Sequence, residues 1–321
     1  MTARPRVHDS ARSEVVLRSA VARELVRAHE ITHVLEVLAT HRVYPILLKG
    51  AALAYTVYPS PAMRPRVDTD VMVPRDHIAV VRDVLLPRGY VEPTMSDGEL
   101  VFGQMQMVKV DAFEVEHVLD IHWRISSQTL FANVLSYDEL DADALAVPAL
   151  GPHARTASVL HALLLACVHP VMHHRNTERL IWFSDIDLLA RRLSDDEFRG
   201  FARLARSKKV GGICARQLAI AANRFHTPIP TDVMDTLGSS PSEPATVYLR
   251  PHRRWHHELF WNVRNLRTCR DRLRLLREVF LPSAQYMLDA YHVGSRGVAL
   301  LPALYLHRCV YGAFKILTGR K

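Results

Sequence analysis

The chain has 321 residues, of which 49% are hydrophobic and 23% are charged, a composition typical of a folded globular protein long enough for two domains. This composition excludes disordered, fibrous and collagen-like chains. An excess of Lys and Arg over Asp and Glu gives a formal charge of +8, which favours an anionic ligand without identifying it.

The first segment, residues 1–40, is predicted to be helical. Apolar residues recur at spacings of three and four from Glu14 to Thr40, which indicates one or two amphipathic helices. The segment contains no continuous apolar stretch, so no secretory signal is expected. The four cysteines form no Cys-x-x-Cys pair, so neither a zinc site nor a disulfide framework is indicated. We therefore expect a cytoplasmic protein with reduced thiols.

Strands and helices alternate in the second segment, residues 41–150. A buried strand over 45–48 is expected to turn through Lys49 and Gly50 into a helix over 51–58. The elements expected next are a proline-rich loop at 58–66, a strand over 68–73, a helix over 75–87 that Gly89 caps, and extended runs over 100–110 and 115–125. This alternation predicts a small mixed-sheet domain.

The third segment, residues 151–321, is predicted to be helical throughout. The expected helices span 155–173, 178–193, 195–207, 211–225, 255–280 and 298–317. The last one is apolar but contains His307, Arg308 and Lys315, so we expect a core helix and no membrane partner. The predicted fold class is therefore α+β, a small mixed-sheet domain followed by an all-helical C-terminal domain.

Asp68 and Asp70 are the strongest candidates for chemistry. Alternate side chains of a strand share one face, so the two carboxylates would point to one place. Magnesium suits such a pair, because it takes carboxylate oxygens together with substrate phosphate oxygens. The alternative is a pair of solvated or capping aspartates at a strand edge.

Asp120 strengthens the metal hypothesis. It stands in another apolar strand, where an uncompensated charge is costly, and three carboxylates on two strands make a two-metal site possible. His122 shares its strand face and is either a supporting residue behind the metal ligands or a core histidine. His169, His173 and His174 lie near one face of a predicted helix and are interpreted as helix-end histidines, because no metal-binding pattern follows them.

Several motifs occur in a fixed order between residues 47 and 123. They are Leu47-Leu-Lys49-Gly50-Ala-Ala-Leu53, Tyr58-Pro59, Arg64, Asp68-x-Asp70-x-x-Val73, Gly89-Tyr90 and Leu119-Asp120-Ile-His122-Trp123. This order resembles that of a bacterial family of uncharacterised nucleotidyltransferases, within the polymerase-beta-like nucleotidyltransferase superfamily. The later segment Trp182–Leu189 also resembles the helical half of that family.

The resemblance implies a palm-like domain and a reaction that moves a nucleoside monophosphate from a nucleoside triphosphate, such as ATP, to an acceptor hydroxyl with release of pyrophosphate. It implies that Asp68 and Asp70 bind two Mg²⁺ ions, with Mn²⁺ as a possible substitute. It also implies that Asp120 is the third acid, which binds metal and orients or deprotonates the acceptor hydroxyl.

The superfamily usually has Gly-Ser at the start of the helix that faces the phosphates, whereas this chain has Lys49-Gly50. We infer that Lys49, one of only six lysines, and the N–H of Gly50 or Ala51 replace the missing serine. Arg64 and Arg66 are candidates for the outer phosphates, because the arginine fork matches phosphate oxygens.

The positive charge is concentrated in residues 250–278, where nine arginines face three acidic residues and give a net charge of +6. This segment is either a solvated helix face or a wall for an anionic acceptor. The acceptor itself is open between a small molecule, a peptide, a protein and RNA.

Two other functions fit parts of the pattern. A metal-dependent glycosyltransferase also uses Asp-x-Asp to hold a nucleotide-sugar, but only about 25 α/β residues precede Asp68, too few for a nucleotide-sugar fold. A non-catalytic nucleotide- or RNA-binding protein would depend on the basic segment and would bind RNA in a salt-dependent way without Asp68 and Asp70.

Overall fold

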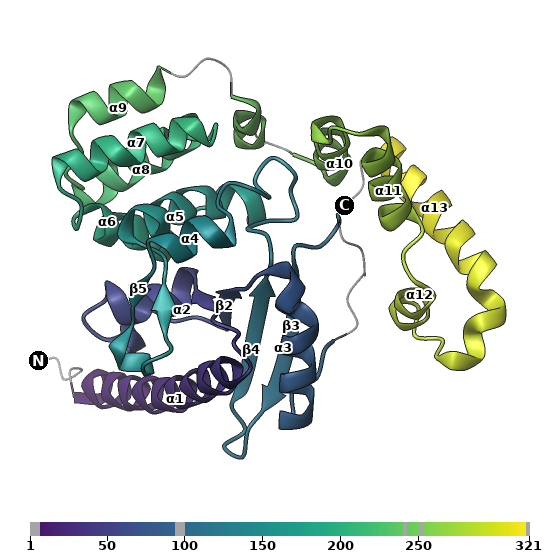
Figure 1. Cartoon of the computed structure of the whole chain (residues 1–321), viewed down its shortest axis with the longest axis horizontal. Helices are drawn as coiled ribbons and strands as arrows, with labels where there is room; N and C mark the ends of the chain where they lie inside the picture. Colours follow the sequence, from purple (N-terminus) through teal and green to yellow (C-terminus); the bar gives the residue numbers. More distant parts are fainter. Residues whose placement is uncertain (1–6, 94–99, 240–242, 251–252, 319–321) are drawn as a thin grey trace, which may run out of the picture.

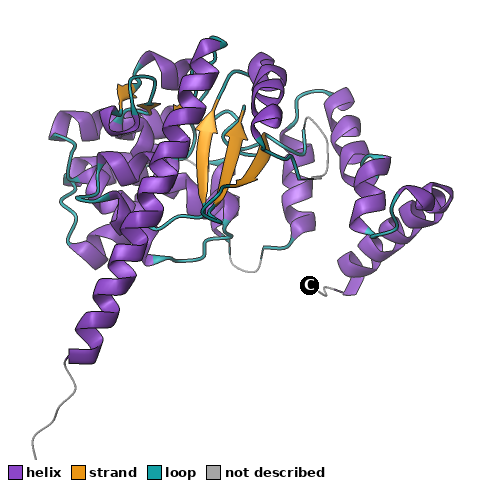
Figure 2. Ribbon diagram, turned by 90° about the horizontal axis from the view of Figure 1, so that it is seen from below, coloured by secondary structure: helices purple, strands orange, loops and turns teal. Residues whose placement is uncertain are grey.

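A mixed β-sheet lies between two layers of helices in the computed structural model of the chain. The structure describes residues 7–93, 100–239, 243–250 and 253–318. Within these ranges the sheet has six strands in the order β3-β4-β2-β1-β6-β5, and helices flank it as Figures 1 and 2 show. The predicted α+β class is confirmed. The strands are β1 (Ile46–Leu47), β2 (Asp68–Met72), β3 (Gln104–Val110), β4 (Glu116–His122), β5 (Leu145–Ala146) and β6 (Arg155–Thr156).

The order of the strands places the sequence-distant acidic residues side by side. Strands β2 and β4 are parallel neighbours, and their register pairs Asp70 with Asp120. The outer strand β3 is antiparallel to β4, whereas β1 is antiparallel to β2 and parallel to β6. Parallel and antiparallel pairs therefore coexist, as predicted.

The two faces of the sheet are covered by different helices. Val71 and Ile121 pack into one core with α1 (Val7–Thr40) and α3 (Ile78–Leu85). Met72 packs into the other core, with the helices that follow the sheet in the chain. Because side chains alternate along a strand, Asp68 and Asp70 share the face of Met72, and Asp120 lies opposite the face of Ile121. All three carboxylates therefore point toward the later helices.

The helical layer on that face has more elements than the periodicity predicts. It contains α5 (Val159–His173), α6 (Leu180–Ala190), α7 (Asp195–Ser207), α8 (Gly211–Phe225) and α9 (Thr231–Gly238). The prediction of a helix from residue 155 is wrong, because Arg155 and Thr156 form β6. The short helices α9 and α4 (Tyr137–Ala142) were not predicted, because one or two turns give too little periodicity.

Local sequence signals explain the first half of the sheet. Residues 14–40 lie in one continuous helix, α1. Strand β1 turns directly into α2 (Lys49–Thr56), and Gly89 ends the α3 segment in the left-handed conformation, with φ 86°, as predicted.

The C-terminal arm, residues 253–318, consists of α10 (Trp255–Asn265), α11 (Cys269–Phe280), α12 (Ala284–Ala290) and α13 (Leu301–Thr318). The single helix predicted over 255–280 is wrong, because the chain breaks between α10 and α11, where Thr268 caps α11. Helix α12 was not predicted.

The prediction that residues 298–317 form a core helix is also wrong. In the described part of the chain, the window Gly297–Phe314 is the one helical stretch long and apolar enough to cross a membrane by length and composition, and only 6% of it is buried. Helix α13 lies at the outer edge of the molecule (Figure 1).

Candidate active site

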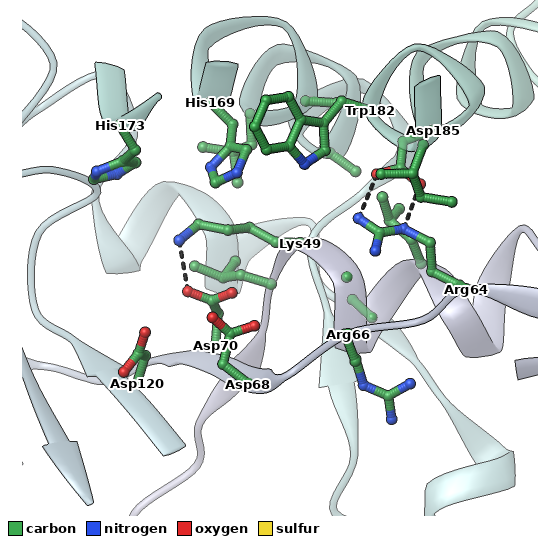
Figure 3. Close-up of a pocket in the computed structure, with 18 of the residues that line it drawn as sticks. Lys49, Arg64, Arg66, Asp68, Asp70, Asp120, His169, His173, Trp182 and Asp185 are labelled. Carbon is green, nitrogen blue, oxygen red and sulfur yellow. Dashed lines mark hydrogen bonds and ion pairs between the residues drawn. The ribbon is translucent and has the colours of Figure 1, made fainter. Parts of the chain in front are cut away.

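Three carboxylates form the floor of a cavity of about 480 Å³ between the sheet and helices α5 and α6. Asp68 and Asp70 come from β2 and Asp120 from β4, and Figure 3 shows the three side chains close together. Asp70 is 5% exposed and Asp120 is 9% exposed. Buried carboxylates this close to one another need a cation or hydrogen-bond donors.

Asp70 has the strongest compensation. Its Oδ1 lies 2.5 Å from Lys49 Nζ and 2.7 Å from His122 Nε2. Burial alone would raise the pKa of Asp70, but Lys49 and His122 hold it well below its usual range. Asp70 is therefore a deprotonated carboxylate that can only accept hydrogen bonds. We assign the proton of this hydrogen bond to His122 Nε2, which donates it to Asp70.

Asp68 lies in the opposite electrostatic situation. Burial raises its pKa, and the nearby charges of Asp70 and Asp120 raise it further. Asp120 is held differently, since one of its oxygens accepts a hydrogen bond of 3.0 Å from Gln106 Nε2 on β3. The floor therefore has more negative charge than Lys49 alone neutralises.

The donor set of the floor fits a divalent cation. Ligand atoms of Asp70, Asp120 and His122 lie within 4.8 Å of one another. Carboxylate oxygens are the preferred ligands of Mg²⁺ and suit Mn²⁺ as well. Asp68 lines the same cavity but is not part of this group of three ligand atoms.

The start of α2 forms one wall of the cavity. Leu48 precedes it in extended conformation, and no side chain caps the first turn, so the N–H groups at Lys49, Gly50 and Ala51 have no acceptor within the helix. Lys49 has a φ of 50°, in the left-handed region that a lysine rarely adopts. Lys49 and Gly50 line the cavity, whereas Ala51 is buried behind them.

Arg64 is engaged by a carboxylate of α6. Its Nε and Nη2 donate to the two oxygens of Asp185, at 2.7 Å each, and the hydroxyl of Tyr58 donates to the same Asp185 at 2.7 Å. A Cβ at position 50 would lie 3.3 Å from Arg64, so Gly50 leaves room for this guanidinium. The group that the sequence assigns to phosphates therefore joins the sheet to the helical layer.

Arg66 points away from the carboxylates in Figure 3. Its guanidinium donates two hydrogen bonds, of 3.0 and 2.6 Å, to Glu24 of α1, which also accepts one from Tyr55. Its side chain is only 2% exposed. The assignment of Arg64 and Arg66 to phosphates remains a prediction, and both arginines already bind carboxylates.

A roof of aromatic side chains, which the sequence analysis did not assign to the site, lies opposite the floor. It is formed by His169, His173 and His174 of α5 and its end, together with Trp182 of α6 (Figure 3). The rings of His174 and Trp182 are 4.4 Å apart, and His169 Nε2 lies 3.2 Å from His174 Nε2. The spacing of four residues between His169 and His173 was the available signal, since it places both on one helix face.

Burial favours the neutral forms of the roof histidines. Burial lowers the pKa of His173 to about 3, with a further contribution from Lys49, and it lowers the pKa of His169 in the same way. Nδ1 of His169 and Nε2 of His173 are buried and have no hydrogen-bond partner in the described part of the chain. Such nitrogens are costly unless a ligand pairs with them.

One comparison with known proteins identifies a family. The family model described as uncharacterised nucleotidyltransferase matches residues 10–226, which include the whole cavity. A solved structure with similarity is the solution structure of the antibiotic-resistance factor ANT(2'')-Ia. It is 11% identical, with a TM-score of 0.41, over 63% of this chain and 98% of that chain. No curated protein matches this chain.

Proposed function

Because this chain belongs to the family of uncharacterised nucleotidyltransferases, we propose that it transfers a nucleoside monophosphate from a nucleoside triphosphate to an acceptor hydroxyl and releases pyrophosphate. Family membership makes the protein a nucleotidyltransferase and favours this reaction over sugar transfer or nucleotide binding without catalysis. The observation that carries the finer proposal is the cluster of Asp68, Asp70 and Asp120 beside the uncapped start of α2, in one cavity.

Asp68, Asp70 and Asp120 would hold two Mg²⁺ ions, or Mn²⁺ in their place. The bound ions would neutralise negative charge on the acceptor oxygen that attacks the α-phosphorus and on the pyrophosphate oxygen that leaves. The three carboxyl groups of the floor support this assignment, since the one lysine or arginine that pairs with them among the described residues is Lys49. His122 would keep Asp70 in position from behind, through the hydrogen bond that the two share.

Lys49 and the first N–H groups of α2 would bind the triphosphate. A helix start with free N–H groups attracts phosphate, and Lys49 adds a full positive charge at the same place. Lys49 now pairs with Asp70, so it would exchange a carboxylate for a phosphate oxygen when the substrate enters.

Asp120 would orient or deprotonate the acceptor hydroxyl. It lies on β4 beside Asp70, and Gln106 fixes one of its oxygens, which leaves the other for a substrate. The neutral nitrogens of His169 and His173 would bind uncharged polar groups of the substrates from the roof.

Label transfer tests the proposal. The full chain is incubated with MgCl₂ and each α-³²P-labelled nucleoside triphosphate, against a panel of small-molecule, peptide, protein and RNA acceptors. Labelled products are identified by mass. We expect one triphosphate to give a labelled acceptor and unlabelled pyrophosphate, with loss of the product when EDTA is added.

Two variants make the test specific to the site. Asp68→Asn and Asp70→Asn should each lower transfer by about 100-fold or more, because each removes a proposed metal ligand. Asp196→Asn is the matched control, since the side chain of Asp196 is 94% exposed and outside the cavity. Transfer at the wild-type rate in either site variant would rule out this site.

A further inference from the structure

Helix α13 presents an apolar surface that is largely exposed to solvent. It packs on α11, α12 and the turn Ser295–Leu300, at the outer edge of the molecule (Figures 1 and 2). Its outward side chains include Leu306, Val310, Tyr311 and Phe314, which are 66%, 60%, 50% and 47% exposed. An exposed helix face of a soluble protein normally consists of charged and polar residues.

The apolar surface is continuous. At about 100° per residue, the exposed positions from Pro302 to Phe314 cover about half of the helix circumference. Within the described side chains this arc has no acidic or basic group except His307, whose ring stacks on Tyr311 and bonds to Tyr291. Val298, Leu300 and Leu281, elsewhere on the arm, are also more than half exposed.

The one arginine of this helix faces the protein. Arg308 Nη2 donates to the carbonyl oxygen of Val279 on α11, at 3.2 Å, and its guanidinium lies over the ring of Tyr286 on α12. Among the described side chains of α13, the charged guanidinium of Arg308 is therefore turned toward the arm, and His307 is the one basic or acidic group of the exposed arc. A large uncovered apolar patch of this kind marks an interaction site.

Exposed arginines also belong to the arm. Arg270, Arg274 and Arg277 lie on α11, the helix that α13 packs against, whereas Arg264 lies on α10 and Arg267 between the two helices. None of the nine arginines of residues 250–278 is among the residues that line the cavity in the described structure. Most of the positive charge of this segment therefore belongs to the arm that carries the apolar face.

We propose that the C-terminal arm binds the surface of an anionic lipid bilayer, with α13 lying in the interface. An arm with both an exposed apolar helix face and exposed basic side chains suits such a surface, because acyl chains cover apolar residues and anionic headgroups pair with arginines. Charge complementarity thus selects the partner. RNA would match the arginines but would leave the apolar arc in water.

The arm lies on the membrane surface and does not cross it. A crossing helix would have to give up the hydrogen bond and the ring contact of Arg308 and carry that charge into the hydrocarbon. In the interfacial position, α13 keeps its packing on α11 and α12, and only the exposed arc enters the lipid.

Vesicle sedimentation with the full chain tests the proposal. The probes are vesicles of phosphatidylcholine alone and of phosphatidylcholine with phosphatidylglycerol. We expect the wild-type chain to sediment with the anionic vesicles and to dissociate partly from them at high salt. Its affinity for the neutral vesicles should be lower by a factor of about ten or more.

Two substitutions in the arc should remove binding. Leu306→Glu with Val310→Glu should lower the vesicle affinity by about tenfold or more, because two charges enter the apolar arc. Both positions are exposed, so folding, followed by circular dichroism, should be unchanged. The matched control is Val110→Glu with Phe113→Glu, which changes exposed apolar residues at the far hairpin and should bind as the wild type does.

Three outcomes would overturn the proposal. If the wild-type chain stays in the supernatant with anionic vesicles, the arm does not bind an anionic bilayer. A dimer in light scattering that Leu306→Glu with Val310→Glu dissociates assigns the arc to a second copy of the chain. Binding to RNA but not to vesicles assigns the arginines to nucleic acid. Because the test needs no turnover, it is independent of the proposed function.

Discussion

Asp70 is the residue on which the electrostatics of the cavity depend. Its Oδ1 accepts hydrogen bonds from both Lys49 and His122, and the carboxyl groups of Asp68 and Asp120 lie nearby. Lys49 holds this position in a left-handed backbone conformation, which costs about 1–3 kcal/mol and persists because the surroundings fix it. Strain at a charged residue that faces a cavity is typical of a functional position.

Lys49→Met should weaken the binding of a triphosphate. The change removes the cation beside the start of α2. In isothermal titration calorimetry, the affinity for a non-hydrolysable triphosphate in MgCl₂ should therefore fall by a factor of about ten or more. Lys209→Met is the matched control, because Lys209 also has a positive φ, of 59°, but lies on the far side of the helical layer, outside the cavity. Equal affinities of the two variants would contradict a role of Lys49 in binding the triphosphate.

The acidic residues of the site could be predicted from the sequence because strand periodicity is a local property. Alternation along β2 predicts a shared face for Asp68 and Asp70, and the structure has it. The partners of the arginines could not be predicted, since Glu24 lies 42 residues before Arg66 and Asp185 lies 121 residues after Arg64. Charge alone suggests phosphate, and only the tertiary structure supplies the competing carboxylates.

At the scale of elements, two glutamates attach the long helix α1 to the sheet. Glu24 binds Arg66, and Glu30 accepts hydrogen bonds from Tyr90 at 2.8 Å and from Lys109 of β3 at 2.9 Å. Burial would raise the pKa of Glu30, but Lys109 and Tyr90 lower it below the ordinary value of 4.5. The charged form of Glu30 therefore stabilises the docking of α1.

Glu30→Gln should destabilise the fold in a pH-dependent way. The free energy of unfolding at pH 7 should fall by about 2 kcal/mol, the worth of hydrogen bonds to a charged group. Because the pKa is lowered on folding, this contribution is complete above pH 4.5 and is lost as the pH falls through the folded-state value. Urea unfolding at pH 7 and in acid measures the difference between the two chains. A difference that stays constant on acidification would contradict the role of the charged carboxylate.

Element prediction succeeded where amphipathic periods were long and failed where other forces decide. The predicted helix over 195–207 matches α7, whose Ser194 and Glu197 form a capping box. The predicted helix over 255–280 contains a break that no proline or glycine marks. The predicted core position of α13 failed because an apolar pattern records which side avoids water, and not whether protein or another phase covers it.

At the scale of the whole molecule, the ion pair of Arg64 and Asp185 joins the sheet to the helical layer. Their ion pair is bidentate and buried, with side-chain exposures of 9% and 5% for the closest contact. Breaking one side of such a pair leaves the other charge buried without a partner. The pair also closes one end of the cavity, so the site depends on how the two units are joined.

Arg64→Leu should destabilise the protein by about 3–5 kcal/mol, because it strands the Asp185 carboxylate. Arg64→Leu combined with Asp185→Leu should recover most of that loss, since no buried charge remains. Denaturant unfolding of the single and double variants measures the coupling. The exposed pair Arg199–Asp232 is the control, and Arg199→Leu should leave the stability nearly unchanged, because solvent screens an exposed ion pair. If the double variant is as unstable as the single one, the loss of stability does not come from the unpaired Asp185 carboxylate.

A carboxylate of the arm reaches the chain that leads into the active site. Glu278 of α11 accepts hydrogen bonds from the backbone N–H groups of Leu100, at 2.8 Å, and Val101, at 3.2 Å. These residues precede β3, where Gln104 lines the cavity and Gln106 holds Asp120. A shift of α11 on a lipid surface would therefore change the position of β3 and of the carboxylates at the floor of the cavity. Thermodynamic linkage makes the effect mutual, so substrate that tightens β3 would change the affinity of the arm for lipid by the same factor.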